Sequence, residues 1–212
     1  MPSVQANTMT SDPDKIIQAI RWLYRPALFL VCLIPFALLA WRTIEGDLGA
    51  NPVEYITRYT GDWSLRFLMI TLALTPLRML TGIGKLLRFR RMLGLFAFFY
   101  VCLHFSTYVW LDRELDLSTV ITDVIKRPYI TVGFTAFLLL IPMAITSTNK
   151  MIKRLGRNWA KLHKAIYIIG ALGVLHYLWL VKADVREPII YAVILIVLLG
   201  FRAVKQRRAL KH

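Results

Sequence analysis

The sequence predicts an all-α protein that crosses a membrane as a bundle of six transmembrane helices, with its N- and C-termini in the cytoplasm. Of its 212 residues, 57% are hydrophobic and only 18% are charged. A soluble domain of this length needs more polar surface than that composition supplies, so we expect an integral membrane protein. Six apolar stretches, each of about 17–20 residues, are long enough to span a bilayer. They lie at 27–43, 63–80, 92–111, 129–147, 162–181 and 187–202.

The charges alternate between successive loops. Basic residues gather in the N-terminal segment, the second loop, the fourth loop and the C-terminal tail, whereas the first, third and fifth loops mix or favour acids. This is the positive-inside pattern, and it places both termini in the cytoplasm. The basic residues of the cytoplasmic segments therefore explain the net charge of +15, and they would also bind anionic lipid headgroups. We do not expect nucleic acid as a partner.

The chain divides into three parts on this basis. We expect a polar cytoplasmic segment at 1–26, a six-helix membrane domain at 27–202 and a basic cytoplasmic tail at 203–212.

The loops on the outer side carry the turn signals. The first outer loop, 46–63, has turn residues at Gly46, Gly49 and Asn51-Pro52. The third loop, LDRELDLSTVITDVIKRP, is predicted to be either a short surface helix whose acids dock a partner or a plain solvated loop.

Three histidines lie in the predicted spans: His104 in the third, and His163 and His176 in the fifth. Ionisable side chains at membrane depth are costly and indicate function. The third and fifth spans run in the same direction. Arg91 precedes His104 by thirteen residues, as His163 precedes His176, and thirteen residues of helix rise about 20 Å. His104 therefore lies level with His176, and Arg91 level with His163.

This matching of levels predicts two redox sites at different depths. The upper pair of imidazoles can ligate one haem iron from opposite sides. The lower pair offers one imidazole and one guanidinium, which is a poorer set of iron ligands but a good clamp for a haem propionate. Arg66, one turn into the second span, is either a snorkelling interfacial arginine or a contact for an anionic cofactor group such as a propionate.

Several alternatives remain open. His104 could be a core histidine bonded to a carbonyl, and His163 could be interfacial. The chain could also be a histidine-lined transporter of metal ions or protons, although proton relays usually use Asp or Glu and the histidine-bearing spans contain neither. A third possibility is a scaffold that anchors a periplasmic enzyme.

Several spaced motifs in order resemble the MsrQ family, also called YedZ, which is grouped with the ferric-reductase-like transmembrane domains. The motifs are GANPVEYITRYTG, LTPLR, RFRRMLGL, LHFSTY, TSTNKMIKRLGRNWAKLHKAIYI and HYLWLVK, and the likeness covers about residues 27–202. The resemblance implies a six-helix b-type cytochrome of the bacterial inner membrane with one or two haems. It would pass electrons to MsrP, a periplasmic molybdopterin enzyme that reduces methionine sulfoxide in oxidised proteins.

The resemblance also implies roles for individual residues. His104 and His176 match the shared haem ligands, His163 matches a further haem-linked histidine, and Arg90 and Arg91 match a basic pair at the inner site. The electrons would come from the quinone pool or from a cytosolic flavin reductase, and FMN is associated with the family, although no residues here can be named for it. We expect an electron-transfer subunit with no substrate-reducing site of its own.

Overall fold

The computed structural model describes residues 13–181 and 184–209, and every regular element within these ranges is a helix. Six helical stretches are long and apolar enough to cross a membrane. They are Leu23–Glu45, Pro52–Thr81, Gly84–Asp112, Pro128–Ile145, Arg157–Leu180 and Arg186–Lys205. The predicted all-α fold with six spans is confirmed, and the chain is a multi-pass membrane protein.

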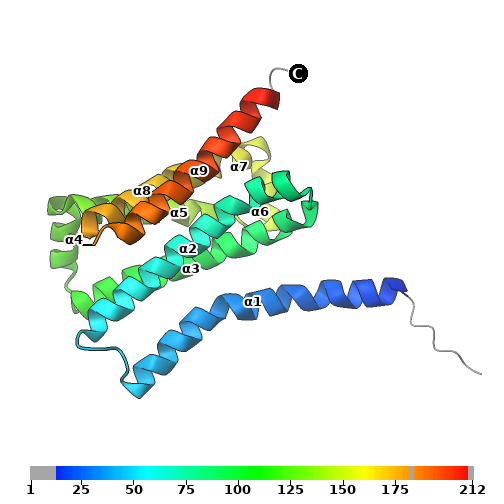
Figure 1. Ribbon diagram of the computed structural model, residues 1–212. Helices are drawn as coiled ribbons and strands as arrows, with labels where there is room; N and C mark the ends of the chain where they lie inside the picture. The colour runs from blue at the N-terminus through cyan, green and yellow to red at the C-terminus, as the bar shows by residue number, and fades with distance from the viewer. Residues whose placement is uncertain (1–12, 182–183, 210–212) are drawn as a thin grey trace, which may run out of the picture. The chain divides into compact units, whose positions relative to one another are not determined.

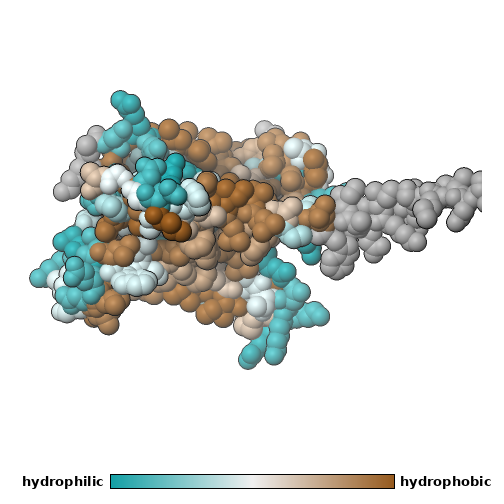
Figure 2. Space-filling view, turned by 90° about the horizontal axis from the view of Figure 1, so that it is seen from below, coloured by the Kyte–Doolittle hydropathy of each residue, from teal (hydrophilic) through white to brown (hydrophobic). Residues whose placement is uncertain are grey.

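Large apolar side chains cover much of the outer surface of these helices. Ile168 is 59% exposed and Val197 is 61% exposed, for example. In Figure 2, brown apolar residues occupy the middle of the visible face, and teal hydrophilic residues gather towards its ends. Exposed apolar surface of this kind suits lipid, and helices suit lipid because they satisfy their own backbone hydrogen bonds.

The first helix, α1 (Pro13–Glu45), belongs to a unit of its own that ends at Ile44. It contains Pro26 and Pro35. The helix begins inside the segment 1–26 that the sequence analysis assigned to a polar N-terminal part. Residues 1–12 of that segment lie outside the described residues.

In the second unit, Glu45–His212, the long helices run alongside one another (Figure 1), and the contacts among four of them close into a ring. In this ring α2 (Pro52–Thr81) packs on α3 (Arg90–Thr107), and α5 (Pro128–Ile145) packs on α8 (Ala165–Leu180). Contacts of α3 with α5 and of α2 with α8 close the ring, and α9 (Arg186–Ala209) lies against α2 and α8. Because the spans follow one another in series, α2 and α5 run one way and α3 and α8 run the other.

Short helical elements join these spans. The 3-10 helix η1 (Gly84–Phe89) leads into α3, and the π-helical turn η2 (Tyr108–Asp112) continues α3. The third loop then forms α4 (Leu117–Lys126), which is the short helix proposed for it.

The connection between α5 and α8 is helical as well. It consists of α6 (Asn149–Leu155) and α7 (Arg157–Leu162). The chain turns at His163 and Lys164, between α7 and α8, so His163 precedes the regular part of the predicted fifth span.

The start of α2 corrects the prediction of an outer loop at 46–63. Turns with positive φ occur at Gly46 and Gly49, but the helix already begins at Pro52. Asn51 is the N-cap, and its side-chain oxygen accepts a hydrogen bond from the backbone N–H of Glu54 at 3.2 Å. The Asn-Pro pair therefore starts a helix, since a capping side chain followed by proline in the first turn is a typical helix N-terminus. The extension adds about three turns to α2.

Candidate functional site

A cavity of about 560 Å³ lies among α2, α3, α5 and α8. Its walls are mainly apolar and include Leu65, Leu68, Val101, Phe105 and Phe137. The lining comes from the first halves of α2 and α5 and from the later parts of α3 and α8. The cavity therefore sits towards the end of the ring where α4 joins α3 to α5. Its volume is in the range of pockets that hold an organic cofactor.

His104 and His176 both line this cavity and approach each other across it. The centres of their imidazole rings are 6.2 Å apart, and the ring planes are inclined by 74°. A metal ion held between two imidazole nitrogens, at about 2 Å from each, places the ring centres roughly 6 Å apart. The spacing of the two rings fits one metal ion between them.

Hydrogen bonds determine which nitrogen of each ring is available. Nδ1 of His104 lies 2.9 Å from the carbonyl oxygen of Thr57, and Nδ1 of His176 lies 2.7 Å from the carbonyl oxygen of Tyr129. A carbonyl oxygen can only accept, so each Nδ1 carries the proton and donates it. The lone pair of each ring then resides on Nε2, which is the arrangement that orients a histidine as a metal ligand.

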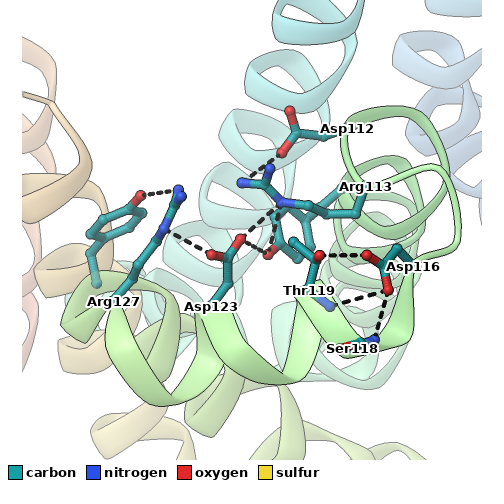
Figure 3. Close-up of polar contacts among 9 residues, drawn as sticks. Asp112, Arg113, Asp116, Ser118, Thr119, Asp123 and Arg127 are labelled. Carbon is teal, nitrogen blue, oxygen red and sulfur yellow. Dashed lines mark hydrogen bonds and ion pairs between the residues drawn. The ribbon is translucent and has the colours of Figure 1, made fainter.

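Three arginines, Arg58, Arg113 and Arg127, also line the cavity. Figure 3 shows how two of them are held by Asp123 of α4. The Asp123 carboxylate accepts from Nε of Arg113 and from Nε of Arg127, each at 2.8 Å, and its side chain is only 7% exposed. The hydroxyl of Tyr108 also donates to it at 2.8 Å.

Other acids at this end of the cavity pair with the arginines as well. Nη2 of Arg113 lies 3.4 Å from Oδ2 of Asp112, and Nη2 of Arg58 lies 2.7 Å from Oε1 of Glu54, so guanidiniums and carboxylates occur here together. A hydrogen bond to Tyr108 raises the pKa of Arg113, and a hydrogen bond to Tyr129 raises the pKa of Arg127, so both stay charged. Fixed guanidiniums beside an apolar cavity suit a ligand with a flat apolar body and carboxylate groups.

Arg66 lies elsewhere. Its Nε donates to the hydroxyl of Tyr191 in α9 at 3.2 Å, and its guanidinium lies 4.9 Å from the centre of the Trp63 ring. It is not among the residues that line the cavity. The structure therefore brings Arg58, Arg113 and Arg127 to the cavity, whereas the sequence analysis had considered only Arg66 as a contact for a propionate.

His163 also lies apart from the cavity, at the junction of α7 and α8. Its Nε2 is 3.1 Å from the hydroxyl oxygen of Thr146, and its ring stacks on Trp159 with 4.0 Å between centres. Trp159 in turn donates from Nε1 to the carbonyl oxygen of Thr146 at 3.0 Å. These contacts fix the orientation of the His163 imidazole, which lies at the end of the helix bundle opposite to α4.

The two predicted inner arginines have different surroundings. Arg90 interacts electrostatically with His163 and with Tyr167, whereas Arg91 donates a hydrogen bond to the side chain of Asn149. The structure thus brings Arg90 near His163, and the place of Arg91 in the inner site stays a prediction.

The sequence analysis missed the carbonyls of Thr57 and Tyr129 and the arginines of the third loop. The carbonyls left no signal in the residue types. Asp123 and Arg127 did leave one, since an acid and a base four residues apart on a predicted helix commonly pair. That spacing predicts that Asp123 pairs with Arg127 within the protein and not with a docking partner.

Comparison with known proteins agrees with this geometry. Residues 60–174 match the family model for the ferric reductase like transmembrane component. The chain is 57% identical over 183 residues to the protein-methionine-sulfoxide reductase heme-binding subunit MsrQ of Herminiimonas arsenicoxydans, covering 85% of this chain and 84% of the relative. It is 53% identical over 191 residues to the subunit of the same name from Xanthomonas campestris pv. campestris (strain 8004), covering 87% and 88%. No solved structure matches the chain. The chain therefore belongs to the MsrQ family of heme-binding subunits of protein-methionine-sulfoxide reductases.

Proposed function

We propose that this protein is an electron carrier of the bacterial inner membrane that holds haem b between His104 and His176. It delivers electrons to MsrP, a periplasmic molybdopterin enzyme that reduces methionine sulfoxide in oxidised proteins. The relatives named above are heme-binding subunits of a protein-methionine-sulfoxide reductase, which supports the same role here.

One observation carries this proposal. Two imidazoles from α3 and α8 face each other across an apolar cavity with 6.2 Å between ring centres, and each has its Nδ1 bonded to a backbone carbonyl. A haem held by two imidazoles has no open coordination position, so it supplies one-electron transfer and not oxygen activation. His104 and His176 orient such a group, and the apolar walls exclude water from it.

The arginines of the α4 end complete the fit. Arg113 and Arg127, held by Asp123, and Arg58, paired with Glu54, line the cavity, and the N–H groups that these acids do not use would bind the carboxylates of a haem. A propionate contact for Arg66 stays a prediction, although its bond to Tyr191 directs it towards α9.

The position of the cavity bears on the direction of electron flow. If both termini are cytoplasmic, as the charge pattern predicts, the end with α4 faces the periplasm. The cavity then lies on the side of the periplasmic acceptor. The quinone pool or a cytosolic flavin reductase would feed the opposite end, where His163, Arg90 and Arg91 form the predicted inner site for a second haem. FMN is a further candidate cofactor, with no site on named residues.

The ligand assignment is tested by absorption spectroscopy of the purified protein. The wild type should show a Soret band and sharp α and β bands on reduction, and His104→Ala and His176→Ala should each lose or shift them. His212→Ala, in the basic tail, is the matched control. An unchanged spectrum in both cavity variants would remove the proposed ligand pair.

The number of haems is tested by the haem-to-protein ratio of the wild type and of His163→Ala. Two haems predict a ratio near two that falls to about one in the variant. A ratio near one in both proteins would rule out the inner haem.

A further inference from the structure

Two glycines lie directly against the imidazoles that face the cavity. A Cβ atom built on Gly61 of α2 would lie 3.1 Å from Cε1 and Nδ1 of His104. A Cβ atom built on Gly133 of α5 would lie 2.7 Å from Nδ1 and 2.9 Å from Cε1 of His176. The first distance is tighter than nearly all real Cβ contacts, and the second pair is shorter than real contacts allow.

Each glycine stands in the same relation to the hydrogen bond of its histidine. The carbonyl that accepts from His104 belongs to Thr57, four residues before Gly61, and the carbonyl that accepts from His176 belongs to Tyr129, four residues before Gly133. Residues four apart lie on one face of a helix, so a side chain at the fourth position stands beside the carbonyl of the first. Glycine at the fourth position leaves that carbonyl open to a ring from the neighbouring helix, and the space is tighter at Gly133 than at Gly61.

The arrangement occurs twice with identical spacing. In both copies the histidine follows the carbonyl residue by 47 positions. Thr57, Gly61 and His104 each have their counterpart exactly 72 residues later, at Tyr129, Gly133 and His176. The helix pair α2 and α3 and the pair α5 and α8 therefore build their halves of the cavity in the same way.

We propose that Gly61 and Gly133 are positioning residues, which dock each imidazole on a helix carbonyl and so set the orientation and basicity of the two haem ligands. The inference rests on the proposed function, because it takes the two imidazoles to be those ligands. Each Nδ1 bonds to a backbone carbonyl, so the groove left by each glycine is what admits the ring to its hydrogen bond.

Replacing glycine by alanine adds a methyl group beside the histidine, and this should disturb His176 at Gly133 more than His104 at Gly61. At Gly61 a shift of His104 by a few tenths of an ångström relieves the contact and lengthens its 2.9 Å bond. At Gly133 the ring of His176 must move further, and its 2.7 Å bond to Tyr129 cannot survive in its present form. Loss of such a partner lowers metal affinity by about 10–100-fold and makes the imidazole a weaker electron donor. A weaker donor stabilises the oxidised metal less, so the reduction potential should rise.

The test compares Gly133→Ala, Gly61→Ala and Gly94→Ala in the full-length protein purified in detergent. Gly94 of α3 is the matched control, because it is also a helical glycine of the same ring and its Cβ would meet only Thr71 Cγ2, at an ordinary 3.8 Å. Alanine favours helix over glycine at all three positions, so differences in helix propensity do not separate the variants. The readouts are the haem-to-protein ratio, the low-spin electron paramagnetic resonance signal and the midpoint potential.

We expect Gly133→Ala to lose about 10–100-fold in haem affinity, or to retain haem with a raised potential and a changed low-spin signal. Gly61→Ala should shift in the same direction by less, and Gly94→Ala should match the wild type. Equal behaviour of all three variants, or a larger effect at Gly94 than at Gly61, would overturn the inference. Should Gly133→Ala not fold, as judged by gel filtration and circular dichroism, the comparison of Gly61→Ala with Gly94→Ala decides it.

Failure of the proposed function looks different. If wild-type protein carries no haem, or if His104→Ala and His176→Ala leave its spectrum unchanged, the ligand assignment fails. If both histidine variants lose the spectrum while the glycine variants behave as wild type, only the positioning role fails.

Discussion

Replacing Asp123 by asparagine should release α4 from the membrane bundle. The Asp123 carboxylate is almost completely buried and accepts three hydrogen bonds, from Arg113, Arg127 and Tyr108. Asparagine has nearly the same shape, but it carries no charge and has only one oxygen. One guanidinium would therefore face that oxygen, and the other would face the NH₂ group, which cannot accept its hydrogen bond. The substitution therefore removes the charge that holds the cluster without leaving a cavity.

The burial of each partner sets the expected magnitude. Breaking a buried ion pair costs about 3–5 kcal/mol, and a hydrogen bond to a charged group contributes about 1.5–3 kcal/mol. The side chain of Arg127 is 45% exposed, so solvent screens its pairing, whereas that of Arg113 is 21% exposed. For Asp123→Asn we expect a loss of about 2–4 kcal/mol in the free energy that holds α4 in place. Arg127→Gln should cost less than about 1 kcal/mol, and Arg113→Gln should fall between them.

Hydrogen exchange followed by mass spectrometry measures this opening directly, because a local release exposes the amides of α4 before those of the bundle. Protection of the peptide that covers Leu117–Lys126 should fall in the order Arg127→Gln, Arg113→Gln, Asp123→Asn. Peptides from α8 serve as the internal control. Equal loss for the two arginine variants, or wild-type protection in Asp123→Asn, would refute the argument from burial.

Two further predictions concern other polar contacts. Arg202 of α9 donates from Nη1 to the hydroxyl of Tyr167 at 2.6 Å and from Nη2 to the carbonyl of Leu72. Arg202→Lys replaces these two nitrogens by one on a shorter side chain that does not reproduce both bond geometries, so it should lower the unfolding free energy by about 1–2 kcal/mol in an SDS titration. An unchanged midpoint would contradict this. Hydrogen bonds from the hydroxyl and backbone N–H of Thr119 and from the backbone N–H of Ser118 hold the pKa of Asp116 below its ordinary value. Its stabilisation of the α4 N-terminus should therefore be present above about pH 4 and be lost as the pH falls through the lower folded pKa, measured as the protection factor of the Thr119 amide, which corrects the exchange rate for its intrinsic dependence on pH. Asp116→Asn should make that protection factor independent of pH in this range, and a pH-dependent protection factor in the variant would show that another group titrates.

The spans and the depth of the histidines follow from the sequence because both depend on distance along a helix. Hydrophobic length predicts where the chain crosses lipid, and a constant rise per residue places His104 and His176 at the same level in parallel helices. Capping chemistry at Asn51-Pro52 was also present in the sequence, but we interpreted it as a turn, so the first three turns of α2 were predicted as loop.

Rotation about each helix axis and the choice of neighbours were decided only by the tertiary structure. Packing of α2 on α3 and of α5 on α8 turns the carbonyls of Thr57 and Tyr129 towards the two imidazoles, and nothing in those residue types marks their carbonyls as acceptors. The same packing directs Arg66 to α9 and brings Arg113 and Arg127, which come from the third loop, to the cavity. The sequence alone specifies how far along a helix axis each residue lies. The direction in which its side chain points is fixed only when neighbouring helices pack and bury particular faces.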